Sequence, residues 1–375
     1  MVSKLFTPIQ LGGITLPNRI AISPMCQYSA DDGCMNDWHL IHLGSLAASG
    51  AGLLMIEATG VTREGRISHG CTGLYNEHNE AAMKRVADAC RRITRAPIGV
   101  QLAHAGRKGS AQAPWLGGKA LSAAESPWTT VAPSALPFGE GWHVPHELTE
   151  GELRALVDAF AAAAGRARRI GLDVAELHAA HGYFMHQFLS PLSNRRSDRY
   201  GGSPENRMRF PLEAARAVRE AWPRERALGA RITGSDWMDG GLAPEDAIAF
   251  ARELKAIGYD YVCVSSGGLS PLARIKVEPG YQVPFAEKVK KAVPIAVRAV
   301  GMIADAEQAE RIVASGQADM VALARAFLDD PRWVWHAAER LGGKVEYPPQ
   351  YARSLPEVWP GAKLARPQGA PLGAA

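Results

Sequence analysis

Hydrophobic positions along the chain alternate between two patterns. Short apolar runs rich in β-branched residues recur eight times, and longer stretches with a helical apolar period lie between them. The runs predict strands at residues 19–25, 52–59, 98–103, 173–178, 227–232, 261–265, 294–300 and 319–324. The longer stretches predict helices at residues 38–49, 79–94, 149–170, 204–221, 244–257, 282–292, 305–314 and 331–340.

Start and stop signals support this alternation. Thr149 and Glu152 form a capping box, and Ser203-Pro204 places proline at a first helical position. Gly171 follows a predicted helix, where glycine accepts the left-handed conformation. Eight strand–helix units predict an α/β protein with a single (β/α)8 TIM barrel. A doubly wound sheet is the alternative, but no Gly-x-Gly-x-x-Gly follows the first strand.

Four segments fall outside the repeat. Residues 6–16, with Gly12-Gly13 as a turn, predict an N-terminal β-hairpin. Residues 104–146 form a long insertion after the third strand, which we expect at the C-terminal face of the barrel as a capping subdomain. We therefore expect the barrel to span residues 1–345 and a C-terminal tail to follow at 346–360. Residues 361–375 are rich in Pro, Ala and Gly and are expected to be disordered.

Composition restricts the partners and the compartment. The 375 residues carry a net charge of +4 with Lys and Arg scattered, so nucleic-acid binding is not indicated. No apolar run reaches the ~18 residues of a membrane span, and the N-terminus has no signal-peptide core. The five cysteines are odd in number and form no CxxC pair. Together these features predict a cytoplasmic protein with reduced thiols and no metal.

A cluster of ring side chains ends the fourth predicted strand. His178, His181 and Tyr183 lie within six residues of one another. At the C-terminal end of a barrel strand, two imidazoles and a phenol can hold a polar oxygen and deliver a proton. Two histidines three residues apart can also be metal ligands, although no third ligand is near in sequence. A single histidine at a strand end is more often a hydrogen-bonded core residue.

The other strand ends suggest a cofactor with a ring and a phosphate. Gly267-Gly268, Gly301 and Ala324-Arg325 follow the last three strands, where barrels commonly bind phosphate with backbone N–H groups. Gln101 and Arg231, on the third and fifth strands, can hydrogen-bond a planar heterocycle. The arginines can equally form salt bridges at the barrel rim, and spacing alone does not identify the cofactor.

Longer motifs carry a specific resemblance. The matching pieces are Leu5-Phe6-Thr7-Pro8, Asn18-Arg19, Ser23-Pro24-Met25-Cys26-Gln27-Tyr28, Gln101-Leu102-Ala103-His104-Ala105-Gly106-Arg107, His178-Ala179-Ala180-His181-Gly182-Tyr183, and the stretch from Gln187 to Arg207. In these pieces the chain resembles the old yellow enzyme family of flavin-dependent ene-reductases, in its thermophilic-like subgroup with xenobiotic reductases. The likeness runs from about Lys4 to Arg353.

The resemblance implies a non-covalently bound FMN, reduced by NADPH or NADH. It implies a flavoprotein of the NADPH dehydrogenase or enoate reductase type that reduces α,β-unsaturated carbonyl or nitro compounds in a ping-pong cycle. The cofactor residues it implies are Ser23, Pro24, Met25, Cys26, Ala58, Gln101, Arg231, Gly301, Ala324 and Arg325. The resemblance also implies that Cys26 lies near the flavin N5 edge and tunes flavin potential and substrate binding, so it joins the expected catalytic set.

On the substrate side, the resemblance implies that His178 and His181 bind the carbonyl oxygen. Tyr183 is then the proton donor, and Tyr28 lines the pocket. Met302 stands where some xenobiotic reductases have a tryptophan, which leaves the shape of the pocket open.

The tail also matches the subgroup. Gln350-Tyr351-Ala352-Arg353 resembles a segment whose arginine reaches into the site of the neighbouring subunit. This implies a homodimer or homotetramer with shared active sites, in which Trp359 can also approach a site. An exposed tail residue without a role is the alternative for Arg353.

Three other functions compete with the ene-reductase. A relative that reduces dienoyl thioesters or dehydrogenates amines with an iron–sulfur cluster would carry extra domains and a cysteine cluster, which this sequence lacks. A metal-dependent or Schiff-base barrel lyase needs a metal set or a lysine at a strand end, and Lys108 and Lys276 lie in loops or past strand ends. A catalytically silent barrel that binds a ligand would not need the set of His178, His181 and Tyr183.

Overall fold

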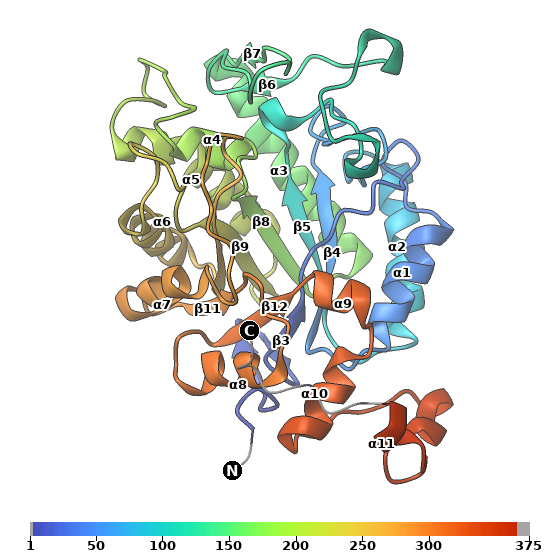
Figure 1. The fold of residues 1–375 in the computed structure, drawn as a ribbon. Coiled ribbons are helices and arrows are strands. Elements are labelled where there is room, and N and C mark those ends of the chain that lie inside the picture. The colour runs from blue at the N-terminus through green and yellow to red at the C-terminus, as the bar shows by residue number, and fades with distance from the viewer. Residues whose placement is uncertain (1–2, 366–375) are drawn as a thin grey trace.

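Eight parallel strands close into a barrel in the computed structural model, which describes residues 3–365 (Figure 1). The barrel strands are β3 (Ile20–Ile22), β4 (Leu53–Gly60), β5 (Ile98–Ala103), β8 (Val174–Ala179), β9 (Ala227–Thr233), β10 (Tyr261–Ser265), β11 (Ala296–Ala299) and β12 (Met320–Leu323). Closure occurs between the last and first strands, where Val321 pairs with Ile20. The predicted TIM barrel is confirmed.

Helices surround the barrel in the order expected. They are α1 (Asp37–Ala47), α2 (Glu77–Arg91), α3 (Glu150–Ile170), α5 (Pro204–Ala221), α6 (Pro244–Ile257), α7 (Val283–Ala292), α8 (Ala306–Ala314) and α10 (Trp333–Leu341). The Thr149 side chain accepts from the Glu152 backbone N–H, and Gly171 ends α3 at φ +84°. Two short helices, α4 (Phe184–Leu189) and α9 (Arg325–Asp329), were not predicted, because six and five residues show too little periodicity.

The predicted hairpin lies at the N-terminal end of the barrel. Strands β1 (Ile9–Leu11) and β2 (Ile14–Leu16) pair antiparallel. A Cβ on Gly13 would meet the backbone oxygen of Glu225 at 2.3 Å, so the turn packs directly against the loop before β9. The hairpin thus stands at the end of the barrel away from the catalytic face.

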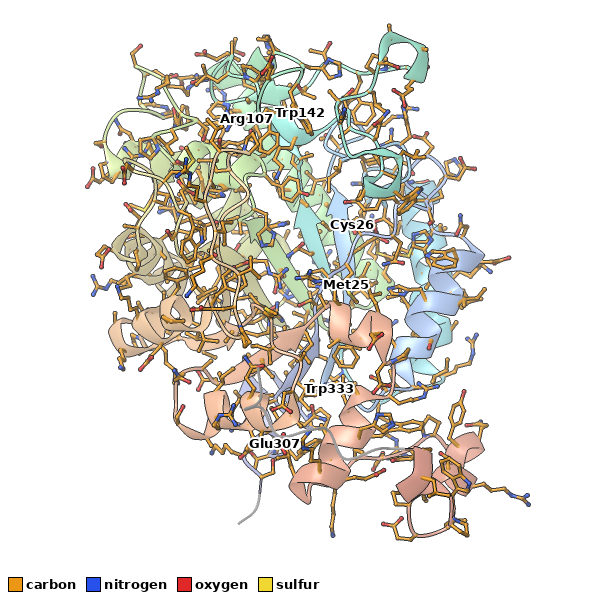
Figure 2. The ribbon with its side chains drawn as sticks, viewed as in Figure 1. Met25, Cys26, Arg107, Trp142, Glu307 and Trp333 are labelled. Atoms are coloured by element: carbon orange, nitrogen blue, oxygen red, sulfur yellow. The ribbon has the colours of Figure 1, made fainter. Side chains whose placement is uncertain are left out.

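The insertion is ordered and stands over the ends of β4 and β5 (Figure 1). Its elements are the 3-10 turns η1 (Gly106–Lys108), η2 (Pro114–Leu116) and η3 (Ala123–Glu125), with β6 (Val131–Ala132) paired to β7 (His146–Glu147) at its end. Arg107 donates to the backbone oxygens of Leu136, Pro137 and Leu269, and Phe138 packs edge-on against Trp142. Figure 2 labels Arg107 and Trp142 in this part of the molecule. Arg107 therefore joins the insertion to the loop after β10.

The tail packs on α10, at the end of the molecule opposite the insertion (Figure 1). Its elements are η4 (Pro349–Ser354) and α11 (Ala362–Ala365). The Trp335 ring stacks on Tyr347 with centroids 3.9 Å apart, and the Arg332 guanidinium lies 4.9 Å from the Tyr351 ring. Of the segment expected to be disordered, residues 362–365 form α11, and residues 366–375 lie outside the described residues. In the described part of the chain, no helix is long and apolar enough to cross a membrane.

Candidate active site

The structure brings the three predicted ring side chains together. His178 lies on β8, and His181 and Tyr183 follow in the turn before α4. The His178 ring centroid is 5.1 Å from that of His181 and 5.1 Å from that of Tyr183. The interplanar angles of 89° and 69° show edge-on contacts. The polar atoms of the three rings can therefore contact the same small ligand.

Both imidazoles are neutral at physiological pH. Burial lowers the pKa of His178 and of His181 well below the usual value, and the positive charges of Arg231 and Lys108 lower each further. His178 Nδ1 accepts from the Ala180 N–H at 3.3 Å, which places the ring proton on Nε2. His181 Nε2 lies 2.7 Å from Ser265 Oγ.

The Tyr183 phenol stays protonated. Burial raises its pKa well above the usual value, and the nearby Cys26 and Tyr28 raise it further. Tyr183 also occupies the N-cap position of α4, so its backbone is fixed where the helix begins. The site therefore holds two neutral imidazoles and a neutral acid.

Side chains that sequence reasoning did not identify hold this turn in place. His186 Nδ1 accepts from the Gly182 N–H at 2.8 Å, and His186 Nε2 bonds the buried Asp236 at 2.7 Å. Gln187 Nε2 donates to the Gly182 carbonyl at 2.8 Å. A Cβ on Gly182 would meet the backbone oxygen of Gly268 at 2.1 Å, so only glycine fits at this φ of +72°. The turn between His181 and Tyr183 is thus bonded on several sides.

The segment after β3 is half-buried, and Figure 2 labels Met25 and Cys26 in it. The Gln27 N–H donates to the buried carboxylate of Glu57 on β4 at 2.9 Å, which anchors the turn before Tyr28. Burial raises the pKa of the Cys26 thiol well above its usual value, and the neighbouring Cys71 and Glu57 raise it further. Cys26 is therefore a neutral thiol rather than a thiolate nucleophile.

Two predicted cofactor residues, Gln101 and Arg231, lie on the barrel strands β5 and β9, on either side of β8. Ala58 pairs with Gln101 across β4 and β5, and His178 pairs with Arg231 across β8 and β9. Gln101 Nε2 donates to Glu176 at 2.8 Å, so its carbonyl oxygen is left as an acceptor. Arg231 is only 6% exposed, and its guanidinium makes long contacts, 3.3 Å to Ser23 Oγ and 3.4 Å to a cysteine sulfur.

These groups fit the ring of FMN. A buried amide carbonyl and a buried guanidinium without a close partner complement a planar heterocycle that carries both carbonyl and N–H groups. At the last strands, Gly301 adopts φ +110° and Arg325 begins α9. Within residues 3–365, Arg325 forms no ion pair with a carboxylate, which suits it to a phosphate.

Some predicted residues lie elsewhere. Arg353 is exposed in η4 and Trp359 is 40% exposed beyond it, both in the tail and away from the strand ends of their own barrel. Met302 is 47% exposed, directly after Gly301. Among the described residues, no group of three His, Cys, Asp or Glu side chains could hold a metal ion.

Comparisons with known proteins identify the family of this chain. The family described as NADH:flavin oxidoreductase / NADH oxidase matches residues 4–343. NADPH dehydrogenase of Geobacillus thermodenitrificans (strain NG80-2) is 44% identical over 355 residues, which are 94% of this chain and 99% of that protein. NADPH dehydrogenase of Listeria monocytogenes serotype 4a (strain HCC23) is 43% identical over 355 residues, again 94% of this chain and 99% of that protein.

Solved structures show the same fold. Morphinone reductase superposes with a TM-score of 0.76 at 29% identity, covering 93% of both chains. A 2-naphthoyl-CoA reductase in complex with 2-naphthoyl-CoA gives a TM-score of 0.82 at 26% identity, covering 91% of this chain and 53% of that one. This chain thus spans about half the length of that reductase. The chain belongs to the NADH:flavin oxidoreductase / NADH oxidase family and is an NAD(P)H-dependent, FMN-using oxidoreductase of the old yellow enzyme type.

Proposed function

We propose that this enzyme reduces the carbon–carbon double bond of α,β-unsaturated carbonyl or nitro compounds. The observation that carries the proposal is the cluster of two neutral imidazoles and a protonated phenol at the end of β8, in which the His178 ring contacts both of the other rings. FMN, when bound, supplies the redox chemistry, by taking hydride from NADPH or NADH and giving it to the substrate β-carbon. Everything else in the reaction is positioning and proton transfer by the protein.

His178 and His181 hold the substrate oxygen. His178 carries its proton on Nε2, which is free to donate. Ser265 Oγ donates to Gln282 at 3.0 Å, so the 2.7 Å contact is a donation from His181 Nε2–H to Ser265. A substrate oxygen would share or replace Ser265 as the acceptor of that proton. Donors fixed before the substrate arrives stabilise the negative charge that develops on this oxygen.

Tyr183 supplies the second hydrogen. Its O–H gives a proton to the α-carbon as charge moves there from the substrate oxygen. A phenol with a raised pKa does not ionise at neutral pH, so the proton is present when the substrate binds. Tyr28 and Cys26 line the substrate side in this proposal.

The cofactor residues divide between the ring and the phosphate. Gln101 and Arg231 would hydrogen-bond the pyrimidine edge of FMN. The remaining ring contacts are assigned to Ser23, Pro24, Met25, Cys26 and Ala58, and the phosphate contacts to Gly301, Ala324 and Arg325.

Removing both histidines tests the oxygen site. We expect His178→Ala with His181→Ala to lower kcat/KM for 2-cyclohexenone by about 10²–10³-fold, because both donors to the oxygen are lost. FMN absorbance should remain, which shows that the barrel still holds the cofactor. His336→Ala is the matched control, since His336 lies on α10, where its ring bonds Asp330, away from the histidines of β8. Wild-type turnover in the double variant would contradict the proposed role of the two histidines.

The tail suggests a shared site, and we propose that Arg353 reaches the active site of a neighbouring subunit in a homodimer or homotetramer. Arg353 is exposed, and its segment packs on α10 by aromatic contacts rather than on its own barrel mouth. Removing residues 351–375 should raise KM for 2-cyclohexenone or reduce the assembly size, as measured by kinetics and light scattering. A truncated enzyme with unchanged size and kinetics would leave Arg353 without this role.

A further inference from the structure

Lys108 joins three loops around the candidate active site. It ends η1, directly after β5. Its ammonium donates to the His181 carbonyl oxygen at 2.7 Å and to the Gly268 carbonyl oxygen at 2.9 Å. It also lies 4.8 Å from the ring centroid of Tyr183 and 4.7 Å from that of Phe138. One side chain thus connects the insertion, the turn after β8 and the loop after β10.

The surroundings of Lys108 contain cations but no counter-charge. In the part of the chain that the structure describes, Lys108 forms no ion pair with a carboxylate. Arg107 precedes it on η1, and, in addition to burial, its like charge lowers the pKa of Lys108. The charge of Lys108 in turn helps to lower the pKa values of His178 and His181 at the end of β8. A partly buried ammonium in such a position is costly, and its two carbonyl partners and two aromatic rings offset that cost only in part.

We propose that Lys108 is a positioning residue that fixes the His181–Tyr183 turn and supplies the positive charge that balances Tyr183 when this phenol gives up its proton. The inference rests on the proposed role of Tyr183 as proton donor. Transfer of that proton breaks the phenol O–H bond, forms a C–H bond at the substrate α-carbon and leaves a phenolate. Burial disfavours the phenolate, and an ammonium beside the ring stabilises it.

This arrangement predicts a pH dependence with a definite sign. Burial lowers the pKa of Lys108 to about 7, and the like charge of Arg107 adds to that effect. The other groups that face it do not titrate in this range, because the pKa values of His178 and His181 lie well below it and that of Tyr183 well above it. The ammonium is therefore present below about pH 7 and is lost as pH rises. The rate of the substrate-reduction step should therefore fall as pH rises through this range, and this fall is the alkaline limb of the pH profile.

The test uses the FMN-loaded enzyme and rapid mixing of the reduced form with 2-cyclohexenone across about pH 6 to 9. Lys108→Met should be slower by roughly 10- to 100-fold at the acid end and should lose the limb. Lys108→Arg keeps its charge, so the limb should move to higher pH. Lys290→Met is the matched control, because Lys290 pairs with Asp319 at the opposite end of the barrel.

A second readout does not depend on turnover. Hydrogen exchange of the backbone amides in the His181–Tyr183 turn, measured by mass spectrometry, should be faster in Lys108→Met by about 10-fold and unchanged in Lys290→Met. A Lys108→Met enzyme with wild-type exchange and a wild-type pH profile would overturn the inference even if Tyr183→Phe is slow. If Tyr183→Phe itself reduces 2-cyclohexenone at the wild-type rate, the proposed proton donor is wrong and the charge-balancing role falls with it. Should Lys108→Met fail to bind FMN, the position of the limb in Lys108→Arg decides the matter.

Discussion

Tyr183→Phe should slow the reduction of 2-cyclohexenone by about 10²–10⁴-fold while NADPH still reduces FMN at the wild-type rate. The substitution removes one oxygen and its proton and keeps the ring that contacts His178. The donors to the substrate oxygen are therefore preserved, and only the proton for the α-carbon is lost. Rapid mixing of oxidised enzyme with NADPH, and of reduced enzyme with 2-cyclohexenone, measures the two steps separately.

Tyr259→Phe is the matched control for this experiment. Tyr259 is also buried, but its hydroxyl donates to the Ala215 carbonyl in the helical layer, away from the strand ends. The control should leave both steps unchanged. An undiminished substrate step in Tyr183→Phe would show that the α-carbon takes its proton from another group or from water.

The fold was predictable because its signals are local. Each strand is a short apolar run, and helices such as α3 and α5 carry caps and a helical apolar period. The short helix α4 shows the limit of this approach. Its six residues are all buried, so no polar face marks the helical period.

The candidate site was predictable only in part. Residues at strand ends, such as His178 and Arg231, meet at one face because the barrel brings all those ends together. The groups that support them meet through contacts between distant segments. His186 and Asp236 are 50 residues apart, and Lys108 and the Gly268 carbonyl are 160 apart. No spacing in the sequence indicates such contacts, so these supports could be found only in the structure.

A buried ion pair within the barrel likewise has no signal in the sequence. Glu176 on β8 and Arg298 on β11 stand within apolar runs, and both are fully buried. The Glu176 carboxylate accepts from Arg298, from the Tyr261 hydroxyl at 2.8 Å and from Gln101 at 2.8 Å. Burial alone would raise the pKa of Glu176, but Arg298 and these other partners outweigh burial and lower it. The pair therefore also orients the Gln101 amide.

Arg298→Met should reduce the free energy of unfolding by about 3–5 kcal/mol, because it leaves a buried carboxylate without its counter-charge. Urea unfolding followed by circular dichroism measures this loss. Arg340→Met, which removes a half-exposed partner of Asp305 on the surface, should cost less than about 1 kcal/mol. A loss no larger than that of the control would mean that Arg298 contributes little to the net stability.

A second substitution, at Glu176, and the pH dependence of stability show whether the loss in Arg298→Met comes from charge or from packing. Adding Glu176→Gln to Arg298→Met should recover part of the loss, because an amide has no charge to leave unpaired. In the wild type the pKa of Glu176 is lowered, so its contribution to stability is present above the unfolded pKa of about 4.3 and is lost as pH falls. In Arg298→Met the sign reverses. Burial then raises the pKa of Glu176 above the unfolded value, and the penalty grows as pH rises through the raised value. The variant should therefore lie closest to the wild type at acid pH, whereas a loss due to packing alone would be independent of pH.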